Sequence, residues 1–416
     1  MAKPNLIVGL DVGSGKLTAV AAAHDTSTNT LQVIAGRSMP CRGLRGGMVT
    51  DIRDTSAAVT ALLGSLERET NQSINQLFVA VRGPHIESFF SHGTYNISRP
   101  DKEIGPADME LAIENAKAVP IKNDNEIIGL FPQGYAVDKQ RGIRNPEGME
   151  GSLLEVDVQI ITGASTHLNN LAKSIQRPGF RMEQPVYGLV PLGDAVLLQD
   201  EKENGAMLLD FGGETISVGV YIGGMMRFSC DIPYGCDILT NDLSSYLNTS
   251  RKAAKEIKER YGVIHPAFLA QEHEISVPLL DGSDSRLIKN VELLDCMQPR
   301  MEELLEQVEH YVGLGGYKPK SIPMVGIITG GGSVMPGMTA LCQDILGLKD
   351  VRKGSVQRDL ITCGDEFFAP TYATALSLII YAMERASEET LYGNKQYRGG
   401  NSALDKLSNF FRGMFG

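Results

Sequence analysis

The sequence contains no long apolar run and no leader-like start, and these absences exclude two classes of protein. No stretch of about 18 consecutive apolar residues occurs, so no transmembrane helix is expected. The first residues, 1–5, carry no hydrophobic segment of the kind that precedes a secretory cleavage site, so secretion is not expected. Hydrophobic residues still make up 42% of the 416 positions, which suits a folded chain with two large domains.

Disulfide and metal-binding patterns are also missing. The six cysteines show no C-x-x-C spacing, so we expect the reduced thiols of a cytoplasmic protein and no zinc site. Residues 271–274 resemble a zinc-protease motif only in part, because the second histidine is absent. The cysteines are Cys41, Cys230, Cys236, Cys296, Cys342 and Cys363.

Basic residues are outnumbered by acidic ones. The chain has 39 Lys and Arg against 50 Asp and Glu, which gives a formal net charge of -11. Nucleic acid is therefore not expected as a partner, because phosphate backbones require clustered positive charge. A short local segment can still bind lipid against the overall charge, so a membrane is not excluded.

One sequence pattern, an aspartate followed by a glycine-rich turn, occurs twice in the chain. Residues 6–20 and 207–220 each read as an apolar strand, an aspartate, a glycine-rich turn and a second strand. Each copy alone is also consistent with an ordinary β-hairpin. Two such hairpins facing each other would form a phosphate clamp, because glycine lets backbone N–H groups approach an anion closely.

The residues of these turns are candidate contacts for a nucleotide and a metal. Lys16 would add a positive charge, and the two aspartates Asp11 and Asp210 would hold Mg²⁺ through water, since Mg²⁺ prefers oxygen ligands and retains several waters. The predicted nucleotide contacts in the two turns are Gly13, Ser14, Gly15, Lys16, Gly212, Gly213, Glu214 and Thr215.

A third glycine turn follows the apolar run 324–329. It consists of Gly330, Gly331, Gly332 and Ser333, and apolar residues at helical spacing follow over residues 337–346. Three consecutive glycines carry no side chains, so a flat base or a ribose could lie against the backbone. A flexible loop is the alternative, which the bordering strand and helix disfavour.

In this order the three turns resemble the phosphate-1, phosphate-2 and adenosine motifs of the actin, Hsp70 and sugar-kinase superfamily. Residues 186–197 and 372–382 stand where that superfamily has its interdomain helices. Residues 254–262 resemble the helix that contacts the nucleoside, which implies this role for Lys258. The resemblance implies ATP and Mg²⁺ as cofactors. It names no residue that orients an attacking water, so it leaves open whether ATP is hydrolysed.

Within the superfamily the chain resembles the bacterial FtsA family over nearly its whole length. The resemblance rests on residues 43–49, on residues 79–86 (similar to the family's S-G-x-H-I stretch), on residues 232–243 and on an amphipathic C-terminus. Gly-Ser-Gly replaces the commoner Gly-Thr-Ser in the first turn, and the tail lacks the usual tryptophan. The implied fold is α/β: an actin-like two-domain ATPase fold with duplicated ribonuclease-H-like cores, an inserted FtsA-type subdomain and a C-terminal amphipathic helix.

The resemblance also implies how the chain is divided. Residues 84–165 would form the inserted subdomain, and residues 243–323 the subdomain that receives the C-terminal peptide of FtsZ. Residues 387–401 would be a flexible linker and residues 402–416 a membrane-targeting helix. The first domain would comprise 1–83, 166–193 and 355–386, and the second domain 194–242 and 324–354.

One helix of the second subdomain is a candidate partner surface. Residues 297–312 place apolar side chains along one helical face and acidic side chains on the opposite face. By resemblance, the candidate contacts with the FtsZ peptide are Arg286, Lys289, Arg300 and Glu303. Each of these residues is equally consistent with an ordinary solvated surface.

Residues 402–416 predict a helix that lies on a membrane surface. Ser402 is a suitable N-cap, and the apolar side chains fall on one stripe behind a glycine-containing linker. A lipid-interface helix is favoured over one that docks on the protein's own core. The predicted membrane contacts are Leu404, Leu407, Phe410, Phe411, Met414 and Phe415.

The resemblance and the tail together predict an ATP-binding, self-associating actin-like filament protein. It would tether the FtsZ ring to the cytoplasmic face of the inner membrane at the division site and recruit other division proteins through the inserted subdomain. A membrane-associated scaffold of a pilus or secretion assembly is the alternative. A sugar kinase would need a catalytic aspartate beside a sugar pocket. An Hsp70-type ATPase would need a β-rich domain where only about two dozen residues follow the last expected helix.

Overall fold

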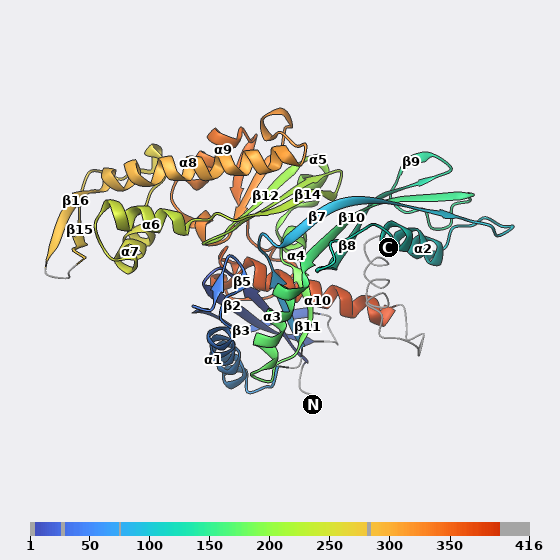
Figure 1. The fold of residues 1–416 in the computed structure, drawn as a ribbon, viewed down its shortest axis with the longest axis horizontal. Helices are drawn as coiled ribbons and strands as arrows, with labels where there is room; N and C mark the ends of the chain where they lie inside the picture. The colour runs from blue at the N-terminus through green and yellow to red at the C-terminus, as the bar shows by residue number, and fades with distance from the viewer. Residues whose placement is uncertain (1–4, 26–29, 75, 281–283, 392–416) are drawn as a thin grey trace.

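The computed structural model describes residues 5–25, 30–74, 76–280 and 284–391. Figure 1 shows a broad upper layer carried on a smaller lower block. The upper layer runs from the long helix α8 (Asn290–Leu314) at one side to an arm of extended strands at the other. The predicted C-terminal helix and its six membrane contacts lie outside the described residues.

The lower block contains a five-stranded sheet in the order β11-β6-β1-β2-β3. Strand β1 pairs antiparallel with β2 and parallel with β6, so the first glycine turn joins two neighbouring strands. Helices α1 and α3 pack beside the sheet. The elements are β1 (Asn5–Val12), β2 (Lys16–Asp25), β3 (Thr30–Pro40), β6 (Gln76–Val81), β11 (Met182–Tyr187), α1 (Ile52–Thr70) and α3 (Ser165–Gln176).

A second sheet repeats the first strand for strand, in the order β14-β13-β12-β17-β18. Asp11 lies beside Ala80 in the parallel pair of the first sheet, and Asp210 lies beside Thr329 in the matching pair of the second. The duplicated core that the family resemblance implies is therefore confirmed. Its elements are β12 (Ala206–Phe211), β13 (Ile216–Ile222), β14 (Met225–Ile232), β17 (Val325–Thr329), β18 (Asp350–Lys353) and α9 (Met338–Leu346).

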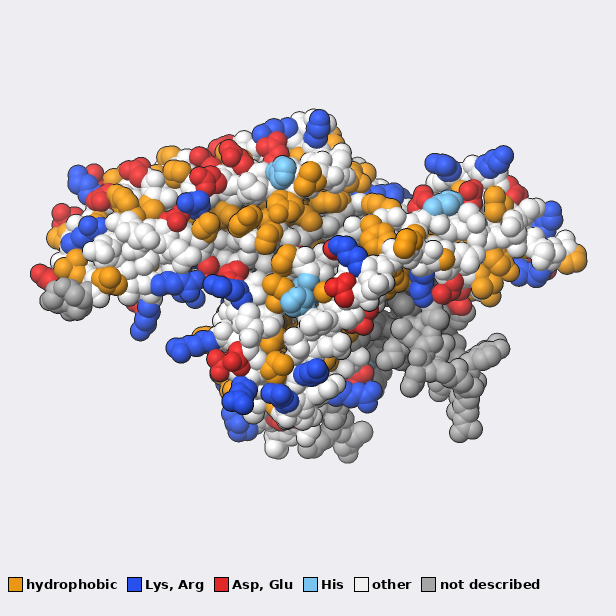
Figure 2. Space-filling view, in the orientation of Figure 1, with side chains coloured by type: hydrophobic (Ala, Val, Ile, Leu, Met, Phe, Trp, Pro, Cys, Tyr) orange, Lys and Arg blue, Asp and Glu red, His pale blue; other side chains and the backbone are white. Residues whose placement is uncertain are grey.

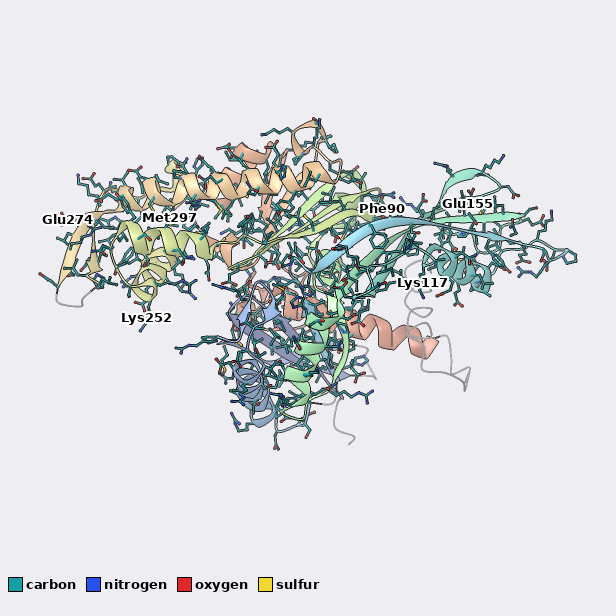
Figure 3. The ribbon with its side chains drawn as sticks, viewed as in Figure 1. Phe90, Lys117, Glu155, Lys252, Glu274 and Met297 are labelled. Carbon is teal, nitrogen blue, oxygen red and sulfur yellow. The ribbon has the colours of Figure 1, made fainter. Side chains whose placement is uncertain are left out.

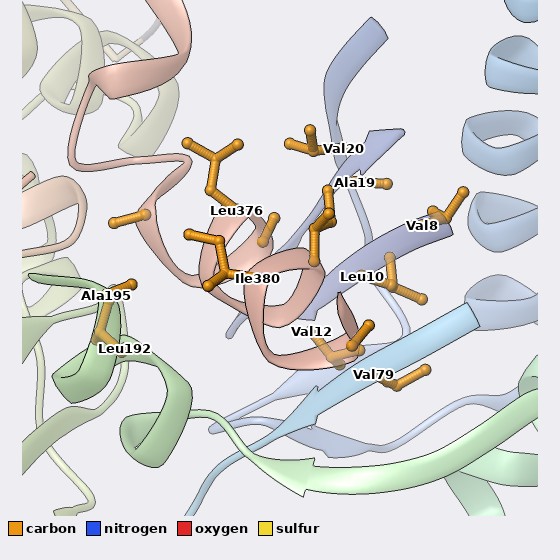
Figure 4. Close-up of a cluster of buried hydrophobic side chains, with 14 of the residues drawn as sticks. Val8, Leu10, Val12, Ala19, Val20, Val79, Leu192, Ala195, Leu376 and Ile380 are labelled. Carbon is orange, nitrogen blue, oxygen red and sulfur yellow. The ribbon is translucent and has the colours of Figure 1, made fainter. Parts of the chain in front are cut away.

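Two helices pack against each other where the sheets meet, as the interdomain segments predict. Helix α10 (Ala373–Leu391) rests on β1, where a Cβ at Gly9 would overlap the carbonyl of Ala375. Helix α4 (Leu189–Val196) rests on β13, where a Cβ at Gly193 would overlap the phenol of Tyr221. Figure 4 shows the apolar side chains of α10 packed among those of β1, β2 and α4. Glycine thus sets the close approach of both helices.

The arm at the right of Figure 1 is a separate unit inserted after β6. Its four-stranded sheet has the order β7-β10-β8-β9, and α2 covers one face over a hydrophobic core of its own. The sequence of residues 106–116, with a proline at an early helical position, predicts a helix, and α2 confirms it: Pro106 stands at the first position, where no partner for an N–H is needed. The elements are β7 (Ile86–Asn96), α2 (Pro106–Ala116), β8 (Asn125–Val137), β9 (Gln140–Ile143) and β10 (Leu153–Ala164).

A second unit lies at the opposite side of the upper layer. Helix α8 buries the predicted apolar stripe, including Met301, Leu305 and Val308, and Figure 2 shows acidic side chains gathered over its outer surface. Figure 3 labels Met297 on α8, and Glu274 where a projecting hairpin begins. The other elements of this unit are α6 (Asp237–Tyr246), α7 (Arg251–Tyr261), β15 (Glu274–Pro278) and β16 (Ser285–Lys289).

Two helices extend beyond their predicted limits. The amphipathic period of residues 55–66 predicts a helix there. Helix α1 spans Ile52–Thr70, because the Asp51 side chain accepts hydrogen bonds from the N–H groups of Arg53 and Asp54 and so caps an earlier turn. Helix α10 continues to Leu391. The predicted start of the linker, residue 387, is therefore too early, because residues 387–391 belong to this helix. Among the described residues, no helix is long and apolar enough to cross a bilayer.

The remaining elements are short. They are β4 (Leu44–Arg45), β5 (Met48–Val49), α5 (Gln199–Asn204), and the 3₁₀ turns η1 (Pro266–Phe268), η2 (Pro319–Ser321), η3 (Gly331–Val334) and η4 (Asp365–Phe368).

Candidate functional site

The two predicted phosphate turns share one backbone hydrogen bond at equivalent positions. The N–H of Gly13 donates to the carbonyl of Lys16 over 3.0 Å, and the N–H of Gly212 donates to the carbonyl of Thr215 over 2.9 Å. The turns therefore close with one shared hydrogen-bond pattern, at equivalent places in the two sheets. They form because each follows a buried strand that is paired on both sides.

Each turn carries a buried hydroxyl oxygen without a hydrogen-bond partner. Neither Ser14 Oγ nor Thr215 Oγ1 has a partner among the described residues. Buried polar atoms are usually satisfied, so these two hydroxyls at matching turns are candidate donors to a bound anion. A Cβ at Gly15 would meet no atom within 4 Å, so the first turn is open on that side. Lys16 is exposed beside it.

The two predicted magnesium ligands bind an arginine of this chain. Arg82 Nη2 lies 2.6 Å from Asp11 Oδ1, and Arg82 Nη1 lies 2.8 Å from Asp210 Oδ2. The Arg82 side chain is only 8% exposed. No group of three or more His, Cys, Asp and Glu side chains that could hold a metal occurs in the described part of the chain. Asp11 and Asp210 therefore do not fit the predicted Mg²⁺ site, because both carboxylates already bind Arg82.

Burial and charge act against each other in this cluster. Burial raises the pKa of Asp11, and the neighbouring Arg82 works against that rise. Burial also lowers the pKa of Arg82, but the attraction of Asp11, Asp210 and Asp231 outweighs it, so the net pKa of Arg82 lies above its ordinary value. The guanidinium therefore stays charged.

Further contacts from the second half reach the same region of the first half. The N–H of Gly83 donates to Asp231 Oδ2 over 2.8 Å, and the N–H of Gly46 donates to Glu214 Oε2 over 2.7 Å. Glu214 was predicted to contact the nucleotide. That contact stays a prediction, and in the structure the Glu214 carboxylate joins the second turn to the β4–β5 segment of the first domain.

The third turn is built for close backbone packing. Gly330 has a φ of 79°, and a Cβ there would overlap the Asp210 carboxylate, so the turn needs glycine at this point. A Cβ at Gly331 would meet nothing within 4 Å, which leaves this part of the turn open. The Ser333 hydroxyl donates to the carbonyl of Gly330 over 2.7 Å and therefore serves the turn itself.

Cys236 connects Lys258 to this third turn, because Cys236 contacts both the lysine and Gly332. Its Nζ donates to the Cys236 carbonyl over 3.0 Å, and a Cβ at Gly332 would overlap the Cys236 sulfur. Burial lowers the pKa of Lys258, whose side chain is 9% exposed. The structure thus brings the predicted nucleoside-contacting lysine to the predicted adenosine turn.

The predicted partner residues divide into two pairs. Arg300 on α8 contacts both Asp242 and Glu303 at 2.5 Å, so three charged side chains share one surface. Arg286 and Lys289 lie on β16, where Lys289 pairs with Glu272 at 3.0 Å.

Three residues of the site were not predicted: Arg82, Asp231 and Cys236. Arg82 could have been found, because it stands where the S-G-x-H-I stretch has serine. Asp231 carries no such signal, since an aspartate at the end of an apolar strand is common at surfaces. Cys236 was expected only as one of six reduced thiols.

Two family models match the chain. One, described as "Cell division protein FtsA", matches residues 207–377, and the other, "SHS2 domain inserted in FTSA", matches residues 83–162. The second match falls on the arm formed by β7, α2, β8, β9 and β10.

Proteins named cell division protein FtsA are similar to the chain over nearly all of its length. The one from Neisseria meningitidis serogroup B is 33% identical over 410 residues, which cover 98% of each chain. The one from Pseudomonas aeruginosa is 32% identical over 383 residues, covering 92% of this chain and 90% of its own.

Solved structures agree with the actin-like fold. A chain of a PilM–PilN type IV pilus biogenesis complex superposes with a TM-score of 0.63 at 18% identity, covering 91% of this chain and 98% of its own. MreB5 of Spiroplasma citri bound to ADP superposes with a TM-score of 0.54 at 11% identity, covering 94% and 99%. At these identities the likeness is one of fold alone.

Proposed function

Because the chain belongs to the FtsA family of cell division proteins, we propose that it is an ATP-binding filament protein that attaches the FtsZ ring to the inner membrane. It would act at the division site, on the cytoplasmic face of that membrane. The proposal has three parts: a nucleotide held between the two turns, a lipid-binding tail, and a surface for the FtsZ peptide.

The observation that carries the nucleotide part is the convergence of both turns on Arg82. Asp11 and Asp210 accept hydrogen bonds from one guanidinium, so the two turns lie close together. An anion between them would satisfy the hydroxyls of Ser14 and Thr215, which have no partner among the described residues. Phosphate groups would lie there, with Lys16 supplying a further positive charge.

The nucleoside would lie against Gly331, with Lys258 nearby. The fold shared with an ADP-bound MreB5 supports a nucleotide as the ligand. Mg²⁺ coordination by Asp11 and Asp210 is not part of this proposal, because Arg82 already binds both carboxylates.

The membrane part rests on the amphipathic pattern of residues 402–416. A fully buried Leu, Phe or Met side chain contributes on the order of 1.5–3 kcal/mol, whereas ordering each residue costs roughly 1 kcal/mol or more in backbone entropy. One tail would therefore bind weakly. A row of tails on a filament gains avidity without new contacts, so attachment would require self-association.

The partner part assigns the two outer units different roles. Residues 243–323 would receive the C-terminal peptide of FtsZ, with Arg300 and Glu303 on α8 and Arg286 and Lys289 on β16 as the contacts. Residues 84–165, the inserted unit, would recruit other division proteins. The two units lie at opposite sides of the upper layer in Figure 1, so both partners could bind together.

A scaffold in pilus assembly is less well supported. The likeness to the pilus complex is one of fold at 18% identity, whereas relatives at 32% and 33% identity are cell division proteins.

Sedimentation with vesicles of anionic phospholipid tests the proposal. The full chain should pellet with the vesicles in the presence of ATP and remain mostly in solution without it. A chain ending at Asn401 should stay in solution under both conditions, because it lacks the predicted tail. Equal pelleting of the two chains would contradict the membrane part, and pelleting of the full chain independent of ATP would contradict the link to nucleotide.

A further inference from the structure

A side chain of this protein takes the place between Asp11 and Asp210 that the sequence suggested for a divalent cation. Arg82 binds one carboxylate from each half of the molecule, at 2.6 Å and 2.8 Å, with its side chain 8% exposed. Its Nη2 also lies 3.4 Å from the hydroxyl of Thr374 on α10. The guanidinium is therefore held from three elements that are far apart in the sequence.

A positive charge at this point stabilises both carboxylates. Two ionised carboxylates that share a buried site repel each other, and either a cation between them or a proton on one of them relieves that repulsion. Lys16, which also lowers the pKa of Asp11, is exposed and is not hydrogen-bonded to it. Asp231 adds a third buried carboxylate beside Gly83. Arg82 is thus the cation that offsets part of the negative charge of this cluster, and it joins carboxylates of the two halves without a metal.

One N–H donor of Arg82, on Nε, is not used by the two carboxylates. Its Nε is buried and has no hydrogen-bond partner in the described part of the chain, as is true of Ser14 Oγ and Thr215 Oγ1. All three are groups that can donate to an anion. A guanidinium that uses its Nη atoms on carboxylates can still donate from Nε to a phosphate oxygen.

The second half of the molecule has no equivalent charge. Arg82 follows Ala80 by two residues, and Gly331 follows Thr329 by two, with Ala80 and Thr329 at matching places in the two sheets. Where the first half has a cation, the second half has an open glycine backbone. At matching positions of the duplicated fold, the first half therefore supplies a positive charge and the second half supplies an open backbone.

We propose that Arg82 replaces the divalent cation of the nucleotide site. Its Nη atoms neutralise Asp11 and Asp210, and its Nε–H donates to a phosphate oxygen of a nucleoside triphosphate. Binding of the triphosphate then does not depend on Mg²⁺. This inference rests on the nucleotide site proposed above and assigns the group that contacts its phosphates.

Calorimetric titration of the full chain with ATP, once in Mg²⁺ and once in excess EDTA, tests the inference. The two dissociation constants should agree within about threefold, because the protein supplies the cation itself. A loss of affinity of about tenfold or more in EDTA would overturn the inference and leave the nucleotide site standing. No binding in either buffer would overturn the nucleotide site and the inference with it.

Substitution of Arg82 gives a second, independent measurement. In R82Q, affinity in EDTA should fall about tenfold or more, and Mg²⁺ should restore much of it, because Asp11 and Asp210 become available to a metal. R82K keeps the charge and should remain insensitive to EDTA. R352Q is the matched control: Arg352 binds the carboxylate of Glu201 at 2.6 Å, and its loss should leave the EDTA sensitivity unchanged. Affinity of R82Q that is the same as wild type in both buffers would overturn the inference.

Circular dichroism establishes that each variant is folded before titration. If R82Q does not fold, the wild-type pair of titrations still decides the question, because it requires no variant.

Discussion

At the scale of single residues, the site is a cluster of buried charges whose balance can be measured. Asp231 accepts a hydrogen bond from the N–H of Gly83, yet burial still raises its pKa to about 6 from an ordinary 3.8. A group with a raised pKa in the folded state binds its proton more tightly there than in the unfolded chain. Its stabilising contribution is therefore complete below pH 3.8 and is lost as the pH rises through about 6.

We therefore expect D231N to gain stability relative to wild type as the pH rises from about 4 to about 7, by up to about 3 kcal/mol, because the variant has no carboxylate to ionise. Urea unfolding at a series of pH values measures this difference. D51N is a control with the opposite sign: backbone hydrogen bonds from Asp54 and Arg53 lower the pKa of Asp51, so its contribution is present above pH 3.8 and is lost on acidification. A gap between D231N and wild type that stays constant with pH would contradict the buried ionisation of Asp231.

At the scale of elements, the close approach of α10 to β1 depends on one missing side chain. Gly9 lies in the middle of β1 and faces the backbone carbonyl of Ala375, which cannot move without shifting the helix. Gly64, in contrast, lies within α1, and a Cβ there would meet only the end of the Arg68 side chain at 3.6 Å. The same substitution should therefore have opposite effects at the two positions.

We expect G9A to lower the free energy of unfolding by about 1–3 kcal/mol, because overpacking forces the strand and the helix apart. G64A should raise it by roughly 0.5–1 kcal/mol, because alanine favours the helix. Chemical denaturation of the two variants beside wild type gives both values. A G9A variant as stable as G64A would contradict the packing of α10 on β1.

At the scale of the whole molecule, a few polar contacts hold the two halves together near the predicted ligand. Arg82 binds Asp210, Gly83 binds Asp231 and Gly46 binds Glu214, and each pair joins the first half to the second. The Glu214 contact is the most exposed of the three, with 29% of its side chain accessible. It can therefore be removed without creating a buried unpaired charge.

We expect E214A to speed hydrogen exchange in residues 43–49, because the N–H of Gly46 loses its acceptor, while the midpoint of global unfolding changes little. Hydrogen exchange measured by mass spectrometry resolves this segment. E259A, on the exposed surface of α7, is the control and should leave exchange at 43–49 unchanged. Unchanged exchange in E214A would show that this contact does not hold the halves in place.

Much of the fold was predictable because its signals are local. The turns at Gly13 and Gly212, the helix 106–116 and the apolar stripe of α8 each depend on residues within a few positions of one another. The limits of α1 and α10 were less predictable, since a cap or a packed face extends a helix beyond its strongest period.

The sequence by itself determined that two similar hairpins and a glycine turn exist, because strand periodicity and glycine's freedom act over short distances. Only the tertiary structure decided what the aspartates bind. Arg82 meets Asp11 across 71 positions and Asp210 across 128, and Glu214 meets Gly46 across 168. Such contacts depend on how two sheets pack through α4 and α10, and no local pattern carries that information. The carboxylates predicted to hold a metal therefore bind an arginine, because the packing of the two sheets places Arg82 between them.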